Sequence, residues 1–295
     1  MAEALNEFFT NAAGLIVDQI PPTDKLPDPE TEIVHPLFSF VNAPVTRSEI
    51  SEVIKLLKDK KTQDFCGLSM HFIKSISDQL LIPLQHIFNL SLESSVVPNQ
   101  MKIAKVIPLF KSGDPLLLDN YRPISLLSSF SKILEKIVAN RLCNYLELHN
   151  LLSNSQFGFR SGHSTIHPMT HFANHVSKAL NEKKHTIAIF CDLRKAFDSC
   201  NHNILLSKLS RLGIRGAPLA WFANYLSNRS QFVCVNGVNS SLRTIQMGVP
   251  QGSILGPILF LLYINDLPLC TELLALLFAD DTTLYLPRAQ ACQNS

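Results

Sequence analysis

The chain has 295 residues, of which 46% are hydrophobic and 17% charged, and its formal net charge is +2. This composition excludes an intrinsically disordered protein and predicts a globular one with more than one subdomain. The charge is uneven, because residues 1–45 hold seven acids and one base, a net −6, which leaves +8 for the remainder. A basic body favours a polyanionic partner, although a solvated surface explains the same charges.

Cysteine spacing and apolar runs exclude further classes of protein. The seven cysteines form no Cys-x-x-Cys pair, which argues against a zinc ribbon and predicts a reducing, intracellular location. The longest apolar run, 254–264, is interrupted by Gly256-Pro257 and is shorter than the ~20 residues of a membrane helix. We therefore expect a soluble intracellular protein, in the cytoplasm or the nucleus, with no membrane contact.

In chain order, the predicted elements follow an acidic, proline-rich stretch, 1–45, which we interpret as a linker with a helix-like start. A capping box from Thr46 to Glu49 opens a helix that ends in the lysine-rich segment 58–61. Apolar periodicity predicts further helices over 78–94, 129–148, 168–181, 202–212 and 218–227. Compact β-prone runs predict strands at 106–110, 187–191 and 232–238.

Two adjacent acids, Asp280 and Asp281, lie between apolar, β-prone runs near the C-terminus. Because burying an unpaired carboxylate is costly, we expect both at the tip of a hairpin or beside cations. Hard cations such as Mg²⁺ take carboxylate oxygens as ligands, so this pair predicts a metal site. Asp192 directly follows the run 187–191, which we expect to be a buried strand. An acid at that position suits a metal ligand, a turn or a helix cap.

Five motifs, in order, resemble those of reverse transcriptases from the non-LTR (LINE- or jockey-type) branch of retrotransposons. Asp192 with Phe197 resembles motif A, the run 248–257 resembles motif B, and Phe278-Ala279-Asp280-Asp281 resembles motif C. Upstream, the segments 120–127 and 156–160 resemble the finger motifs. The resemblance covers about 105–286, and the ordered set is far more specific than any single motif.

The resemblance implies an α+β fold of the right-hand polymerase type, with an antiparallel palm sheet backed by helices. It implies fingers and palm over 46–295, with the motif-bearing core at about 90–295. Only 14 residues follow Asp281 (295 − 281). We therefore expect a C-terminally truncated domain whose thumb is missing, which raises the possibility that this fragment is inactive alone.

By the same resemblance, Asp192, Asp280 and Asp281 are catalytic ligands of two Mg²⁺ ions, for which Mn²⁺ is a substitute. Two-metal nucleotidyl transfer requires carboxylates from separate strands to converge. Asp192 and Asp280 are 88 positions apart (280 − 192), so folding has to bring them together. A solvated turn residue is the alternative for Asp281. Asp198 is expected to cap the following helix rather than to bind metal.

Four residues are implied to bind the nucleotide. Phe197 resembles the steric gate beneath the incoming sugar, and the alternative is a core phenylalanine. Gln251 resembles the residue that contacts the nucleotide or its template partner, and Gly252 permits close backbone approach. Arg122 resembles the finger arginine that pairs with the triphosphate, and the alternative is a surface salt bridge. Arg160 is implied to contact template phosphate.

The implied partners are an RNA template, a DNA primer and dNTPs. One rival hypothesis is a catalytically silent remnant that at most binds nucleic acid. A second is an RNA-dependent RNA polymerase, against which Phe197 and the finger motifs argue. Histidines recur at every fourth position from His163 to His175, but no cysteine or acid completes a zinc set, so we expect exposed or template-facing histidines there.

Overall fold

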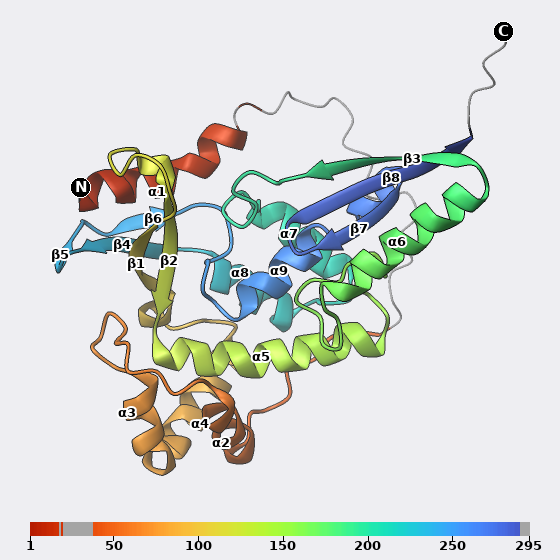
Figure 1. Cartoon of the computed structure of the whole chain (residues 1–295). Helices are drawn as coiled ribbons and strands as arrows, with labels where there is room; N and C mark the ends of the chain where they lie inside the picture. The colour runs from red at the N-terminus through yellow and green to blue at the C-terminus, as the bar shows by residue number, and fades with distance from the viewer. Residues whose placement is uncertain (18, 20–37, 290–295) are drawn as a thin grey trace, which may run out of the picture.

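A computed structural model of the chain describes residues 1–17, 19 and 38–289. Two sheets flank a body of helices (Figure 1). The helices are α1 (Ala2–Val17), α2 (Arg47–Leu56), α3 (Met70–Ser75), α4 (Ser77–Ser94), α5 (Ser129–Leu148), α6 (Ile166–Asn181), α7 (His202–Arg211), α8 (Ala217–Leu226) and α9 (Leu255–Tyr263), with short 3₁₀ turns η1 (Asn99–Lys102), η2 (Leu118–Asn120) and η3 (Leu267–Cys270). No helix of this part of the chain is long and apolar enough to span a membrane.

The larger sheet has five strands in the order β2-β1-β4-β5, with β6 also paired to β4. Its strands are β1 (Ile103–Phe110), β2 (Tyr121–Leu127), β4 (Arg229–Val235), β5 (Val238–Asn239) and β6 (Arg243–Ile245). β1 and β2 form an antiparallel hairpin, while β1 and β4 run parallel although they lie far apart in the sequence.

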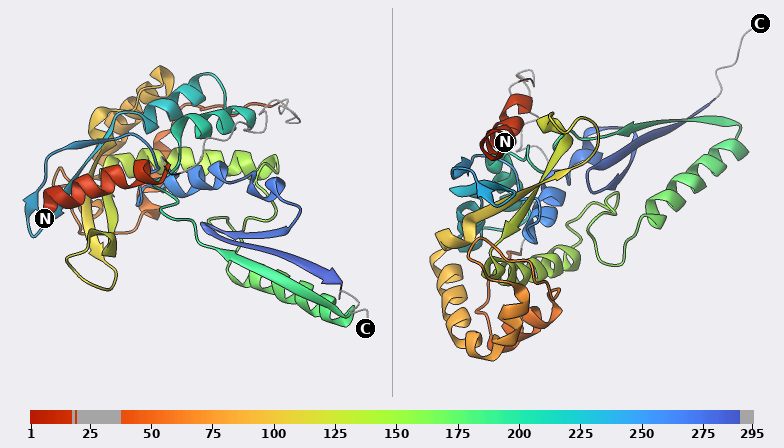
Figure 2. Two further views of the ribbon diagram at one scale, coloured as in Figure 1. Left: turned by 90° about the horizontal axis from the view of Figure 1, so that it is seen from above. Right: turned by 60° about the vertical axis from the view of Figure 1, so that its left-hand side comes forward.

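The smaller sheet is antiparallel, in the order β3-β8-β7. Its strands are β3 (Lys184–Cys191), β7 (Leu274–Phe278) and β8 (Asp281–Ala289). Helix α6 packs against all three strands, and this sheet and helix project from the body (Figure 2). The mixed α+β architecture, with helices backing a sheet, agrees with the predicted fold class.

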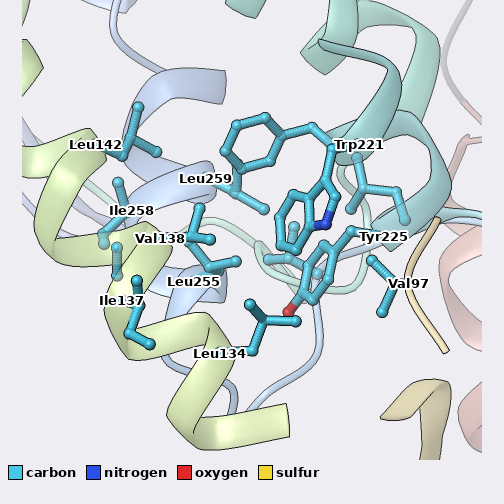
Figure 3. Close-up of a cluster of buried hydrophobic side chains, with 14 of the residues drawn as sticks. Val97, Leu134, Ile137, Val138, Leu142, Trp221, Tyr225, Leu255, Ile258 and Leu259 are labelled. Carbon is cyan, nitrogen blue, oxygen red and sulfur yellow. The ribbon is translucent and has the colours of Figure 1, made fainter. Parts of the chain in front are cut away.

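The main core lies between α5, α8 and α9. Trp221 and Tyr225 of α8 stack on one another with ring centroids 5.6 Å apart, and aliphatic side chains of α5 and α9 surround them (Figure 3). Leu134, Val138, Leu255 and Leu259 are among these, and all are buried. Burying such large apolar side chains contributes strongly to stability, so this core holds α5, α8 and α9 together.

Most predicted elements form close to their predicted ends. The helix predicted over 129–148 is α5 to the residue, and Thr46 caps α2 by accepting a hydrogen bond from the Glu49 amide. The strand expected to be buried, β3, is instead an edge strand. Ile187 and Ile189 are 54% and 50% exposed, because α6 covers only the other face of this thin sheet.

The N-terminal stretch differs in part from the expected linker. Helix α1 packs against β4, β5 and β6. Leu5 is fully buried beside Val106 and Val233, and the Asn6 amide donates to the Ser241 carbonyl at 2.8 Å. Residues 20–37, which carry five of the six prolines of the predicted linker, lie outside the described residues. The first 17 residues therefore belong to the packed structure.

Candidate functional site

Asp192, Asp280 and Asp281 come together at one end of the smaller sheet. The register pairs Cys191, the last residue of β3, with Thr282, so Asp192 follows β3 beside Asp281, the first residue of β8. Asp280 lies in the two-residue turn between β7 and β8, where Phe278 pairs with Asp281. The predicted hairpin is confirmed, and we call these three residues the carboxylate corner.

The corner is solvent-accessible and its carboxylates are unengaged. Asp192 and Asp281 are exposed, and Asp280 is half-buried. Within the described residues, none of the three carboxylates takes part in a hydrogen bond or an ion pair. Carboxylate oxygens are the donors that hard divalent cations prefer, so the donor chemistry fits such ions. However, no three His, Cys, Asp or Glu side chains of the described chain are gathered closely enough to hold one. The backbone assembles the corner without closing a metal set.

A buried glutamine, Gln156, supports the turn that carries Asp280. Gln156 lies beside Leu277 in a parallel bridge, and its Oε1 accepts hydrogen bonds from the amides of Gly158 at 2.7 Å and Ala279 at 3.2 Å. Ala279 has φ of 59°, a left-handed conformation that is uncommon for a residue other than glycine. Gly158 packs so closely that an added Cβ would overlap the Ala279 backbone. The segment 155–158 therefore fixes the turn that carries Asp280.

The turn after Asp192 is tied to the loop before α9. The amides of Gly248 and Val249 donate to the carbonyls of Cys200 and Phe197, each at 2.8 Å. The Gln251 amide nitrogen donates to both carboxylate oxygens of Asp198, at 2.8 and 2.9 Å. Burial raises the pKa of Asp198, and the hydrogen bond from Gln251 and the charge of Lys195 partly oppose that shift.

The same loop is tied to β2. The Ser125 amide donates to the Gln251 carbonyl at 3.0 Å, and a Cβ on Gly252 would lie 2.5 Å from the Ser125 oxygen. Gly252 has φ of 113°, which favours glycine. We call these three segments, the turn 192–200, the loop 248–253 and β2 at Ser125, the loop junction. It joins motifs that are up to about 130 residues apart in the chain.

A buried glutamate of α5 holds the C-terminal end of the loop 248–253 in place. Glu135 of α5 is 1% exposed, and its Oε2 accepts hydrogen bonds from the amides of Ile254 at 2.8 Å and Leu255 at 3.3 Å. Its Oε1 accepts from the Ser131 hydroxyl at 2.8 Å. Helix α9 has no side-chain cap of its own, so Glu135 supplies the acceptor for its first amides.

The other predicted residues fall in different surroundings. The half-buried Phe197 ring stacks on Phe260 with centroids 4.5 Å apart, which fixes its position. Arg122 is exposed on β2, opposite Leu109 in the hairpin. Arg160 is held internally. Its guanidinium pairs with both Glu147 oxygens and donates to the carbonyls of Ser153 and Gln156. Its predicted template contact stays a prediction.

One prediction about the residues of this region is wrong. Asp198 does not cap the following helix, because Asn201 caps α7 by accepting hydrogen bonds from the amides of Asn203 and Ile204. Other supports were missed, namely Gln156, Gly158, Glu135 and helix α1. The sequence did contain a signal for Glu135, because this acid lies among the apolar residues of one predicted helix.

Helix α1 reaches the loop junction. Phe9, Thr10 and Ala13 line a narrow pocket together with Asp198 and Gln251. The Lys195 ammonium lies 4.2 Å from the centroid of the Phe8 ring and 3.6 Å from an Asp119 oxygen. A cation over an aromatic face is attracted by the ring quadrupole, so α1 helps to position the turn after Asp192.

Comparison with known proteins identifies a family that the chain matches. Residues 110–295 match the family described as reverse transcriptase (RNA-dependent DNA polymerase). The chain is 36% identical over 229 residues to the probable RNA-directed DNA polymerase from transposon BS of Drosophila melanogaster, covering 76% of this chain and 25% of that protein. It is 34% identical over 249 residues to the RNA-directed DNA polymerase from mobile element jockey of the same species, covering 81% and 27%. The chain therefore spans about a quarter of the length of these curated relatives.

Proposed function

The chain belongs to the reverse transcriptase family, as its ordered motifs predicted, and we propose that it forms the polymerase core of a LINE- or jockey-type retrotransposon protein. The proposed reaction joins the 3′-hydroxyl oxygen of a DNA primer to the α-phosphorus of a dNTP on an RNA template. The bond from that phosphorus to pyrophosphate breaks. The single observation that carries this proposal is the carboxylate corner, where acids 88 positions apart (280 − 192) are brought together by strand register.

In this proposal Asp192, Asp280 and Asp281 would hold two divalent ions, Mg²⁺ or its substitute Mn²⁺. When bound, the ions supply charge neutralisation of the triphosphate and activation of the primer hydroxyl. The protein's own contribution is to hold the three carboxylates on a turn that Gln156 and Gly158 fix from behind. The exposure of the corner and its unengaged oxygens support this role.

The nucleotide-binding residues in the proposal are Arg122, Phe197, Gln251 and Gly252. Phe197 has a ring fixed by Phe260, which suits a steric gate that excludes a ribose 2′-hydroxyl. Gly252 lets the loop approach β2 closely. The exposed guanidinium of Arg122 suits a triphosphate, because its fork matches phosphate oxygens. The sheet β3-β8-β7 with α6 would be the palm and the β1–β2 hairpin part of the fingers, within a domain spanning 46–295.

Primer extension with an RNA template, dNTPs and Mg²⁺ tests the proposal. Asp280→Asn keeps the side-chain size and removes the charge, so extension should fall by more than about 100-fold, because several kcal/mol of charge stabilisation are lost. Asp59→Asn is the matched control, since Asp59 is exposed and pairs with His71 on another part of the surface.

Three outcomes would contradict the proposal. Full extension by Asp280→Asn would remove the carboxylate corner from catalysis. A wild-type chain that binds the primer–template but extends no primer would favour the silent nucleic-acid-binding remnant. A preference for rNTPs over dNTPs would instead favour an RNA polymerase.

A further inference from the structure

Asp198 is the one acid of the turn 192–200 whose carboxylate is engaged by a neighbouring motif. Both of its oxygens accept from the single amide nitrogen of Gln251, at 2.8 and 2.9 Å. The residue is half-buried, so its charge is partly withdrawn from water, an arrangement that costs free energy unless partners offset it. A costly buried carboxylate beside a candidate site points to a function.

The backbone around Asp198 leaves little room for movement. A Cβ on Gly248 would lie 2.6 Å from the Asp198 carbonyl oxygen, and Gly248 has φ of 86°. The Val249 amide donates to the carbonyl of Phe197, the residue before Asp198. The turn 192–200 and the loop 248–253 are therefore held together by their backbones. This backbone packing places the Asp198 carboxylate beside Gln251.

This contact fixes how Gln251 presents its amide. An ionised carboxylate only accepts hydrogen bonds, so the nitrogen of the Gln251 amide must face Asp198 and the carbonyl oxygen must face away. Without Asp198, the amide could rotate and present either a donor or an acceptor. The side-chain carbonyl oxygen of Gln251, Oε1, has no hydrogen-bond partner within the described residues, unlike the backbone carbonyl, which accepts from Ser125. Oε1 is therefore an available acceptor of fixed orientation.

The neighbouring surface is shaped by three elements. Asp198 and Gln251 share a narrow pocket with Pro123 and Ser125 of β2 and with Phe9 of α1. Sequence neighbours of this pocket are Phe197, the proposed sugar gate, and Arg122, the proposed triphosphate ligand. Gln251 thus shares a pocket with the sequence neighbours of both proposed nucleotide ligands.

We propose that Asp198 is a positioning residue for nucleotide binding, which orients Gln251 so that its carbonyl oxygen accepts a hydrogen bond from the incoming dNTP. The inference rests on the proposed function and deepens it, because it names the residue that sets the donor–acceptor character of the nucleotide site. Asp198 acts through Gln251 and touches no reacting atom.

A double-mutant cycle tests the inference. The four proteins are wild type, Asp198→Ala, Gln251→Ala and the double variant. The probe is a fluorescent N-methylanthraniloyl dATP, titrated onto each protein with a bound primer–template. Hydrogen bonds to charged groups contribute about 1.5–3 kcal/mol, so each single variant should raise the Kd about tenfold or more. Since Asp198 acts through Gln251, the double variant should bind no more weakly than Gln251→Ala alone.

Primer extension with the same proteins gives a second reading. Asp198→Ala should raise the KM for dNTP by a similar factor and leave kcat within about twofold, because it removes binding common to the ground and transition states. Asp64→Asn is the matched control. Asp64 is a buried carboxylate that accepts, within the described chain, from the amides of Cys66, Leu68 and Ser129, so its variant should lower Tm without changing the Kd.

The results separate this inference from the proposed function. Effects of Asp198→Ala and Gln251→Ala that multiply in the double variant overturn the inference while leaving the polymerase proposal intact. Wild-type Kd values in Asp198→Ala also overturn it. Coupled binding effects in a protein that extends no primer would support the inference and overturn the catalytic proposal.

Discussion

The loop junction and the carboxylate corner are both built from distant motifs, but by opposite means. At the junction, the side chain of Asp198 is bound to Gln251, and the backbones of 197–200 and 248–251 are hydrogen-bonded. At the corner, Asp192, Asp280 and Asp281 meet only through strand register, and their carboxylates stay unengaged within the described chain. The proposed nucleotide site is thus organised without any ligand, whereas the carboxylates of the proposed metal site have no protein partner within the described chain.

This comparison predicts that the corner is most sensitive to its backbone support. Gly158→Ala places a Cβ into the Ala279 backbone, 2.9 Å from its Cα. Because that neighbour is backbone rather than a flexible side chain, we expect a loss of about 3 kcal/mol or more of unfolding free energy. Primer extension should also be lost, since the turn carrying Asp280 must shift.

Denaturant unfolding and primer extension check this prediction. Gly14→Ala is the control, because a Cβ there meets nothing within 4 Å and alanine favours the interior of α1. If Gly158→Ala kept wild-type stability and activity, the segment 155–158 would not support the corner.

The junction should depend instead on a buried charge. Glu135→Ala leaves the amides of Ile254 and Leu255 without their acceptor, at a cost of about 1–3 kcal/mol. Glu135→Gln keeps one carbonyl oxygen and should lose less. Thermal unfolding compares the two variants, and fluorescent dATP binding should weaken in parallel, since the loop before α9 carries Gln251. An alanine variant as stable as the glutamine variant would contradict this anchoring role.

The sequence predicted the elements of both regions better than the contacts between them. Apolar periodicity located α5 to the residue, because one helix face packs into the core. It did not reveal that β3 is an exposed edge strand, since a β-prone run reads the same whether one face or both are covered.

Side-chain partners were harder to predict for a related reason. Asp198 was assigned from its neighbours in the chain and Arg160 from a family motif, yet the partners of both depend on tertiary structure. The partner of Asp198 is Gln251, 53 positions away, and that of Arg160 is Glu147, on α5. Motif order identified the corner because the family resemblance carries that long-range information, which local patterns lack.

The pH dependence of stability gives a smaller effect that separates function from packing at the junction. Burial raises the pKa of Asp198. A raised folded-state pKa means that the neutral form is favoured on folding, so this contribution to stability is present at low pH and is lost as pH rises through the folded pKa. Asp198→Asn lacks the ionisation and should gain Tm relative to wild type, by a few degrees, as pH rises from 4 to 7.

Scanning calorimetry across that pH range, with Asp59→Asn as the exposed control, measures the difference. A constant Tm difference between Asp198→Asn and wild type would contradict the buried-charge account. Weaker dATP binding together with a higher Tm would be the pattern expected of a residue kept for function at a cost in stability.

The smallest effect is predicted on the outer face of the sheet that carries the corner. Ile187 and Ile189 are 54% and 50% exposed, while Ala188 between them packs toward Phe157 and Tyr285. Side chains alternate across a strand, so both isoleucines lie on the face away from α6. Ile189→Thr should therefore change the unfolding free energy by no more than about 0.5 kcal/mol. Leu276→Ala, at a buried position of β7 on the face toward α6, should cost about 2–5 kcal/mol in the same sheet. Denaturant unfolding of the two variants compares how much each face of the sheet contributes to the unfolding free energy. A large loss in Ile189→Thr would mean that this face is covered in solution, and the corner would then be supported from both sides, as the loop junction is.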